Sequence, residues 1–571
     1  MINFGKESRT EQYLLLAALI LAVFLRFFQL GVTPLTDSES RLALQALDIA
    51  RGGHPMLNSN PGYILLTALN FFIFGAGNFL ARFWPALAGA SLVLLPISFS
   101  RQLGRRGAIL LAFALAIDPG FIAVSRIAGD QMMALGFLVL FISFLHLRYY
   151  GIAGVMAGLS LLAGPSIWFG LLGIAVTLVL VRLGKQVHKD LVFPDYSAHS
   201  IRTMFSWGLG TLLLVGTLGF FVLNGLSAWA GSLTLFIKWF FPSIPSQGWY
   251  PWLTLMVYEP LLLLLGVIAL VVSFLRNDRK MINLAVLSFV FLFLASMNPS
   301  HQPGDIAWFI LPFWVFAVMG LSHILDGMES HLRGSIKPWL IAGIVFIFMV
   351  FLSLNLKALP ASLGINNEIF QSRILLITGS LVLLVLVVLL VSAVWDEKIA
   401  QAGLLLGSLA ALTLYTISAA VGGAGIKSSE YSEIWQNSPR FSGADLLVGT
   451  IQDLSQWQIG QPEPFSITFL SDADYPSLRW VLRDFKVEQV ISLPMDASPR
   501  LVIHAQGDEL ALTGQYFEQD FEIARVPAFS VLEWDGWLRW SLTRLVPHDS
   551  SHIVLAVRAD LLPVSSEGDG Q

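Results

Sequence analysis

The fold is indicated first by the stretch Arg26-Phe-Phe-Gln-Leu-Gly-Val-Thr-Pro34-Leu-Thr-Asp37-Ser-Glu39-Ser-Arg41. It contains the end of the first apolar run of the chain and the first charged residues after that run. The run itself, from Tyr13 to Leu30, is about long enough to cross a bilayer, and no small-residue cleavage site follows it. We therefore expect a first membrane span that ends near Leu30. Two carboxylates, Asp37 and Glu39, then lie immediately outside the membrane.

The composition is that of an integral membrane protein. Of the 571 residues, 55% are hydrophobic and only 13% are charged, which is more apolar surface than a soluble domain can bury. The chain has no Cys, so disulfides, thiolate metal sites and cysteine nucleophiles are excluded. From Lys427 to the C-terminus there are 10 Lys and Arg against 21 Asp and Glu, a net charge of −11, whereas the preceding part carries +7. This acidic C-terminal part argues against nucleic acid as a partner.

Apolar segments predict roughly thirteen transmembrane helices, because a spanning helix needs about 20 such residues. Lys and Arg gather on alternate connections, which assigns those connections and the N-terminus to the cytoplasm. An odd number of spans leaves the C-terminal part outside. We expect a membrane domain over 1–424 and an extracytoplasmic domain over 425–571, in the cell membrane. The expected spans are 12–30, 79–100, 107–124, 131–147, 151–164, 166–183, 206–226, 251–275, 281–297, 305–325, 337–354, 373–394 and 400–421.

The outer side carries two long loops and the soluble domain. Within the first loop, 31–78, the stretches Ser38 to Ala50 and Gly62 to Phe74 are expected to be helices lying at the membrane surface. The second loop, 227–250, is rich in aromatic residues, as is typical of the membrane interface. The tail reads as a small α/β domain. Its expected strands are 465–470, 487–493, 501–505 and 529–532. One expected helix ends at about residue 485, and a second covers 537–545.

Asp37 and Glu39 are the first candidates for chemistry. Such a pair can bind a divalent cation, or one carboxylate can act as general base on an acceptor hydroxyl. The alternative is helix capping, with Asp37 or Ser38 as N-cap and Glu39 in the first helical turn. The spacing alone leaves both interpretations open.

Further polar residues lie in or near apolar segments. Arg126 and Asp130 flank an outer connection, where they either pair with each other or bind phosphate or metal. Glu259 lies about eight residues into an apolar span, where a carboxylate is costly, so we expect it to face the bundle interior or a water-filled cavity. His301, in an outer loop, is either an ordinary solvated histidine or a functional group.

The run from Arg26 to Gly53 resembles the opening of the GT-C glycosyltransferases, the superfamily of protein O-mannosyltransferases and aminoarabinose transferases. The resemblance continues through Phe74-Gly75, Ala81-Arg82-Phe83-Trp84-Pro85, Gly104-Arg105-Arg106-Gly107-Ala108 and Ser125-Arg126-Ile127-Ala128-Gly129-Asp130, and covers about the first 150 residues. Tyr258-Glu259-Pro260 and the segments Trp480 to Phe485 and Trp537 to Arg544 are similar to a subgroup named for flippase-associated activity.

The resemblance implies a GT-C-like membrane bundle that takes sugar from a polyprenyl-phosphate carrier at the outer membrane face. It implies Asp37 or Glu39 as base or metal ligand, and Arg126 and His301 near the donor phosphate. The family usually has adjacent Asp and Glu, whereas here Ser38 separates them. Where the family often has Lys-Pro-Pro or His-Gly-Pro, the only nearby imidazole is His54.

The cofactor and the class of protein stay partly open at this point. A divalent cation is a candidate cofactor, and metal dependence varies across the superfamily. The alternative function is a non-catalytic GT-C-like protein that assists lipid-linked sugar translocation or scaffolds a complex. A secondary transporter is disfavoured, because the sequence contains no inverted repeat and no matched pair of broken helices. Membrane lipid and the sugar carrier are the expected partners.

Overall fold

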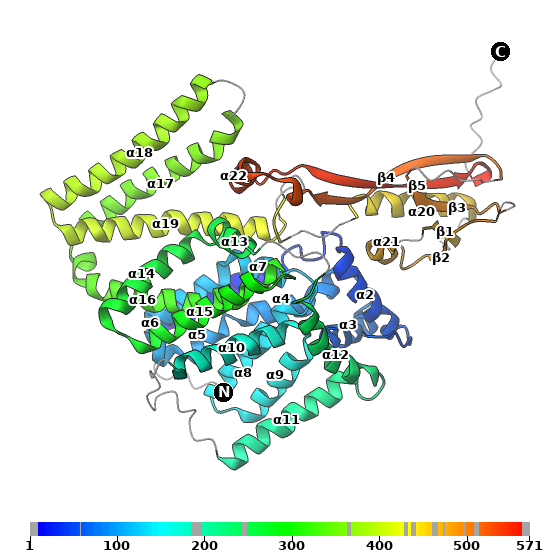
Figure 1. Ribbon diagram of the computed structural model, residues 1–571, viewed down its shortest axis with the longest axis horizontal. Coiled ribbons are helices and arrows are strands. Elements are labelled where there is room, and N and C mark those ends of the chain that lie inside the picture. The colour runs from blue at the N-terminus through cyan, green and yellow to red at the C-terminus, as the bar shows by residue number, and fades with distance from the viewer. Residues whose placement is uncertain are drawn as a thin grey trace.

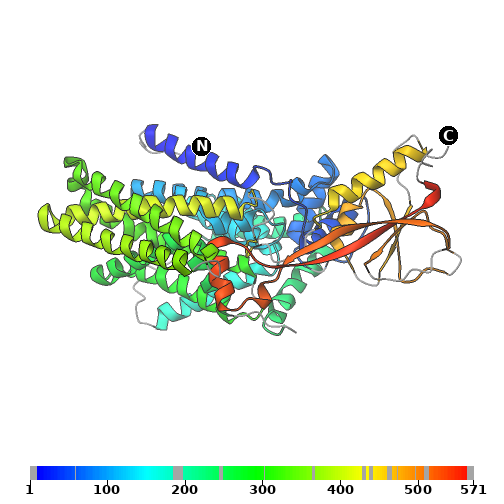
Figure 2. The ribbon, with the colours of Figure 1, turned by 90° about the horizontal axis from the view of Figure 1, so that it is seen from above.

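The computed structural model describes residues 9–57, 59–183, 197–242, 248–300, 302–362, 367–426, 432–435, 441–459, 466–471, 474–494, 497–506 and 513–561. Most of these residues form a helical bundle, and a sheet domain extends from one end of it (Figures 1 and 2). The bundle comprises α1 (Arg9–Phe27), α4 (Asn78–Ser91), α5 (Leu94–Ser98), α6 (Ser100–Ile117), α7 (Pro119–Ser125), α8 (Gln131–His146), α9 (Tyr150–Leu162), α10 (Ser166–Leu183), α11 (Ala198–Gly216), α12 (Asn224–Lys238), α13 (Tyr250–Tyr258), α14 (Pro260–Arg276), α15 (Arg279–Met297), η2 (Pro303–Ile306), α16 (Ala307–Gly334), α17 (Lys337–Ser362), α18 (Asn367–Val394) and α19 (Glu397–Gly423).

The helices account for a membrane-spanning bundle. Within the described residues, eight helices are long and apolar enough to cross a membrane, or up to ten if each of two bent pairs counts as one span. The bent pairs are α6 with α7, at 51°, and α13 with α14, at 98°. The three further spans expected from the sequence fall on α8, α9 and α11, which do not meet the same length and hydropathy limits. The total of thirteen therefore stays a prediction.

The first outer loop forms the two helices that its sequence pattern predicts. They are α2 (Asp37–Ala50) and α3 (Pro61–Phe74). The expected boundaries around 206–226 were wrong, because the helix there begins at Ala198 and ends at Gly216. The second outer loop is not irregular, since α12 occupies its first part.

The C-terminal domain is a five-stranded mixed sheet with the order β2-β1-β3-β5-β4. Parallel pairing joins β1 (Ser466–Leu470) to β2 (Lys486–Val490) and to β3 (Leu501–Ala505). β5 (His548–Arg558) runs antiparallel to β3 and to β4 (Tyr516–Pro527). The helices α20 (Ala444–Ile459), α21 (Pro476–Val481) and α22 (Trp534–Thr543) complete the domain, and η3 (Phe529–Val531) replaces the strand expected at 529–532.

The sheet domain contacts the bundle at two separate places. At the first, α21 packs against α2, and the Trp480 ring lies 5.7 Å from the Phe71 ring. At the second, the long strands β4 and β5 reach back from the sheet to the bundle, where α22 joins them (Figures 1 and 2). Trp480, Trp537 and Trp540 belong to the bundle's buried apolar core, whereas β1, β3 and β5 enclose a separate core.

Candidate functional site

The candidate site begins with a capping box at the start of α2. Thr36 is the N-cap, and its Oγ1 accepts a hydrogen bond from the Glu39 backbone N–H at 3.4 Å. In return, Glu39 Oε2 accepts from the Thr36 backbone N–H at 2.9 Å. This reciprocal pair satisfies two of the otherwise unpaired N–H groups at a helix start. The capping interpretation therefore holds for Glu39, but the N-cap is Thr36 rather than Asp37 or Ser38.

Glu39 is fully engaged by its neighbours. Its Oε1 accepts from Arg82 Nε at 2.7 Å and from the Ala128 N–H at 2.8 Å, and its Oε2 accepts from Arg82 Nη2 at 2.8 Å. The side chains of Glu39 and Arg82 are only 1% and 2% exposed. Burial by itself raises the pKa of Glu39, but the Arg82 guanidinium and the backbone N–H groups outweigh burial and lower it to about 2. A carboxylate so paired is a poor base.

Arg82 was not singled out from the sequence, although it organises the site. Its remaining donors reach the Leu30 carbonyl at 3.2 Å, the Thr33 carbonyl at 2.8 Å and the Pro34 carbonyl at 3.0 Å. These bonds fix the segment that leads from the first span to Asp37. The available signal was a lone arginine inside the apolar segment 79–100, because a charge in such a helix is costly without a partner.

Asp37 differs from Glu39 because it keeps an open oxygen. Its Oδ1 accepts from the Ser477 backbone N–H at 3.0 Å and so caps the start of α21. Within the part of the chain that the structure describes, no hydrogen bond reaches Oδ2, and the side chain is half-buried. Asp37 thus links the surface helix α2 to the C-terminal domain while one carboxylate oxygen faces outward.

A polar groove of about 430 Å³ runs between α2 and α21. Asp37 does not line it, but lies four residues, about one helical turn, before the lining residue Arg41. The groove mixes both signs of charge with apolar surface. Its lining residues include Arg41, Gln45, Asp48, Arg51, Asp474 and Arg479.

The described residues do not form a divalent-cation site around the expected pair. Glu39 is directed at Arg82 and Ala128, whereas Asp37 is directed at Ser477, so the two carboxylates do not chelate one ion. No group of three or more His, Asp or Glu side chains gathers anywhere in the described ranges. The metal-ligand interpretation therefore does not fit these two residues as a pair.

Arg126 binds the end of the first span rather than Asp130. Its Nη1 donates to the carbonyls of Phe28, at 2.8 Å, and of Arg26, at 3.1 Å, and its Nη2 to that of Gln29, at 3.2 Å. A guanidinium at this position satisfies carbonyls that a helix leaves unpaired at its C-terminus. Arg126 and Arg82 also line a cavity of about 20 Å³, room for about one water.

Asp130 joins two helices through the backbone. Its Oδ2 accepts from the Ser166 N–H at 2.8 Å and thereby caps the start of α10. Gly164, between them, has φ of +149°, and a Cβ there would lie 2.8 Å from Asp130 Oδ2. Glycine at position 164 is therefore required by its backbone conformation and by this close approach. An Arg126–Asp130 ion pair does not occur among the described residues.

Glu259 lies inside the bundle, as the cost of a lipid-exposed carboxylate predicts. It sits at the break between α13 and α14, is 1% exposed, and its Oε1 accepts from the Gly120 N–H at 3.3 Å. Asp118 occupies the equivalent break between α6 and α7, where Trp314 Nε1 donates to it at 2.6 Å. The two helix breaks thus bring the buried carboxylates of Asp118 and Glu259 close to Gly120, in the first turn of α7.

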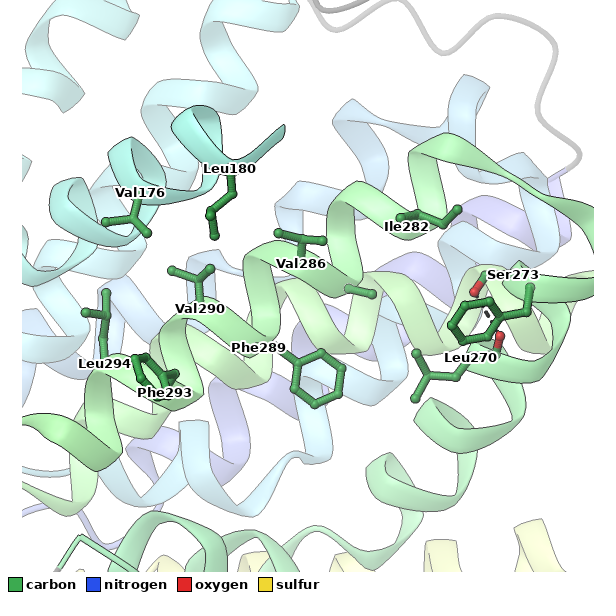
Figure 3. A pocket seen from close by; sticks show the side chains of 12 residues that line it. Val176, Leu180, Leu270, Ser273, Ile282, Val286, Phe289, Val290, Phe293 and Leu294 are labelled. Atoms are coloured by element: carbon green, nitrogen blue, oxygen red, sulfur yellow. Dashed lines mark hydrogen bonds between the residues drawn. The ribbon is translucent and has the colours of Figure 1, made fainter. Parts of the chain in front are cut away.

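The two histidines add little to the site. His54 is exposed on the loop after α2, and His301 lies outside the described residues. An apolar groove of about 660 Å³ lies between α10, α14 and α15 (Figure 3). Its nearest residue on α14, Leu270, is eleven residues from Glu259, about 16 Å along a helix. This groove is therefore separate from the polar site.

Comparison with solved structures identifies the architecture. Aminoarabinose transferase ArnT from Cupriavidus metallidurans, bound to undecaprenyl phosphate, matches with a TM-score of 0.55 and 15% identity over 98% of this chain and 100% of that chain. The same protein in the apo state gives 0.54. The oligosaccharyltransferase AglB from Archaeoglobus fulgidus matches at a TM-score of 0.44 and 13% identity, over 87% of this chain and 69% of that chain, and supports no further argument. No protein-family model and no curated protein sequence matches the chain. The expected fold is confirmed: the chain is an integral membrane protein with the fold of ArnT.

Proposed function

We propose that this protein is a glycosyltransferase that takes a sugar from a polyprenyl-phosphate carrier at the membrane face bearing the C-terminal domain, the outer face. The likeness to ArnT supports the proposal because it extends over the whole length of both chains, soluble domain included. That neighbour is described bound to undecaprenyl phosphate. The alternation of Lys and Arg between connections supports the outer face.

One observation carries the proposal to particular residues: Asp37 is a carboxylate with an open oxygen, held at the mouth of the bundle by a rigid network. The capping box of Glu39 and the contacts of Arg82 fix the backbone on either side of it. General-base catalysis needs this kind of fixed placement. We therefore assign the base to Asp37 and a positioning role to Glu39.

The chemistry is a displacement at the anomeric carbon. The acceptor hydroxyl forms the new bond to this carbon, the bond from the carbon to the carrier phosphate breaks, and Asp37 takes the hydroxyl proton. The phosphate leaves with the bonding electrons, so cationic groups near it lower the barrier. Arg126 is a candidate for this role, although the cavity of about 20 Å³ beside it has to widen before it admits a phosphate. The polar groove between α2 and α21, which begins at Arg41 one helical turn from Asp37, is the proposed approach for the acceptor.

The test is sugar transfer by the purified protein with polyprenyl-phosphate sugars, comparing Asp37→Asn with the unmodified chain. We expect the amide to lose about 10²–10⁴-fold in rate while lipid binding is retained. Asp445→Asn is the control, because Asp445 is likewise an aspartate in the first turn of a helix, α20, but is exposed and far along the chain from the candidate site. Normal turnover by Asp37→Asn would remove Asp37 from the mechanism.

A non-catalytic GT-C-like protein is the second candidate, and one observation favours it. In this chain Ser38 separates the Asp and Glu that are usually adjacent in the family, and Glu39 forms a buried ion pair with Arg82. On this alternative the protein assists translocation of lipid-linked sugars or scaffolds a complex. Retention of the lipid by the unmodified protein, without transfer of any sugar tested, would favour it over the enzyme.

A further inference from the structure

The helix α22 carries an apolar stripe that the protein itself does not cover. It joins the two longest strands, β4 and β5, at the point where they reach the bundle (Figure 1). Trp537 and Trp540 are 5% and 0% exposed and pack into the bundle core. By contrast, Trp534 is 76% exposed and Leu538 is 66% exposed.

The three faces of α22 are distinct in chemistry. At 100° per residue, Trp534 and Leu538 lie on one stripe, and Trp537 and Trp540 lie on a second, which faces the bundle. Asp535 and Arg539 form a third, exposed and charged. The large apolar residues flanking the helix, Val531 and Leu545, are 68% and 53% exposed. If water surrounded the faces of α22 that point away from the bundle, these large apolar side chains would stay hydrated, which is unfavourable in free energy. The apolar stripe therefore needs an apolar environment.

The stripe continues the exterior of the membrane-spanning helices. The Trp534 ring lies 5.8 Å from the Trp249 ring, which directly precedes α13, and Trp249 stacks on Tyr250 at 5.0 Å. Next to α22 runs α17, a candidate span whose outward residues include Leu354, 60% exposed. Tryptophan and tyrosine at the end of spanning helices are typical of the head-group region. The neighbouring surface is thus already one that faces lipid.

We infer that α22 is an interfacial membrane anchor, with Trp534 and Leu538 inserted among the lipids of the leaflet on the side of the C-terminal domain. Asp535 and Arg539 then face the water above the head groups, as expected for an amphipathic helix lying in the interface plane. The inference is independent of catalysis. It means that the sheet domain is bound to the bilayer as well as to the bundle.

The test uses the absence of Cys from the chain. Single variants Trp534→Cys, Leu538→Cys, Asp535→Cys and Arg539→Cys are labelled with the environment-sensitive fluorophore NBD and reconstituted in nanodiscs of phosphatidylcholine and phosphatidylglycerol. All four positions are exposed, and only Trp534→Cys removes a ring contact, the one with Trp249. Nitroxide-labelled lipid should quench the probes at 534 and 538 about two-fold or more over those at 535 and 539, and aqueous iodide should quench in the reverse order.

Two outcomes would overturn the inference. Equal quenching by iodide at all four positions would mean that the stripe is solvated. Protection of positions 534 and 538 from both quenchers would mean that protein covers them, from a partner or a second copy of this chain. Loss of transferase activity has no bearing on either result, so the experiment separates the anchor from the proposed function.

Discussion

Replacement of Glu39 by Gln tests whether the buried Glu39–Arg82 pair holds the candidate site together. Both side chains are nearly inaccessible, at 1% and 2% exposure. The lowering of the Glu39 pKa from 4.5 to about 2 corresponds to about 3 kcal/mol of stability at neutral pH. Breaking a buried ion pair by removing one partner costs about 3–5 kcal/mol, which agrees. We expect Glu39→Gln to lower the free energy of unfolding by about 3 kcal/mol, roughly 150-fold in the folding equilibrium.

The assay is unfolding of the detergent-solubilised protein, followed by tryptophan fluorescence as a function of pH. Because the folded-state pKa is depressed, the contribution of Glu39 is fully present above its unfolded pKa of about 4.3 and is lost as the pH falls toward 2. The stability of the Glu39→Gln variant should therefore depend less on pH over this window. The double variant Glu39→Gln with Arg82→Met should recover part of the loss, since no unpaired buried charge remains.

The control is an exposed ion pair between the C-cap residue of α2 and the segment after α21. Arg51 and Asp484 are 3.3 Å apart with side chains 54% and 69% exposed. Such surface pairs contribute about 0–1 kcal/mol, so Asp484→Asn should be nearly neutral. If Glu39→Gln is no more destabilising than Asp484→Asn, the buried pair does not organise the loop, and the positioning role of Glu39 is refuted.

Two further predictions concern the bundle. Glu259→Gln should be neutral or stabilising by up to about 1 kcal/mol in the same unfolding assay, because it removes a buried carboxylate next to Asp118 and retains the acceptor for the Gly120 N–H; a clear loss of stability would contradict this. In intact cells, an impermeant maleimide should label Glu518→Cys, on the sheet domain, and spare Arg105→Cys, in a connection expected to be cytoplasmic; the reverse labelling would invert the topology.

The sequence predicts local structure well where a short pattern determines it. A helix was expected from Ser38 to Ala50, and α2 begins at Asp37, but the N-cap is Thr36 rather than the expected Asp37 or Ser38; the pattern Thr36-x-x-Glu39 is the signature of a capping box. The strands β1 and β3 and the helix α22 likewise match expected segments, because apolar residues dominate them. The fold class could also be predicted from the sequence, because long apolar segments directly indicate membrane-spanning helices.

Contacts between distant segments were not accessible. Arg82 is 43 residues from Glu39, and no local sequence pattern indicates that the two form an ion pair. This ion pair gives Glu39 a structural role in place of the expected role as a base. Nor does any pattern indicate that Asp37 caps the start of α21 at Ser477, which lies 440 residues further along the chain. The strands β4 and β5 were missed although both carry a signal. In β4, Phe517, Phe521 and Ile523 alternate with acidic residues, and β5 contains the apolar run 553–557; only its first part, Asp549-Ser-Ser-His552, is polar throughout.

The two attachments of the sheet domain differ in chemistry. At α21, Ser477 donates to Asp37 and Trp480 donates to Asn78, and the buried Trp480 ring packs against the Phe71 ring. Near α22, the Arg544 guanidinium lies 3.6 Å from the buried Glu433 and over the Tyr258 and Trp540 rings. A rigid body held at two points keeps only one rotation, about the line that joins them. The sheet domain can therefore rock only about the line from α21 to α22, and any larger movement that uncovers Asp37 requires the α21 attachment to break.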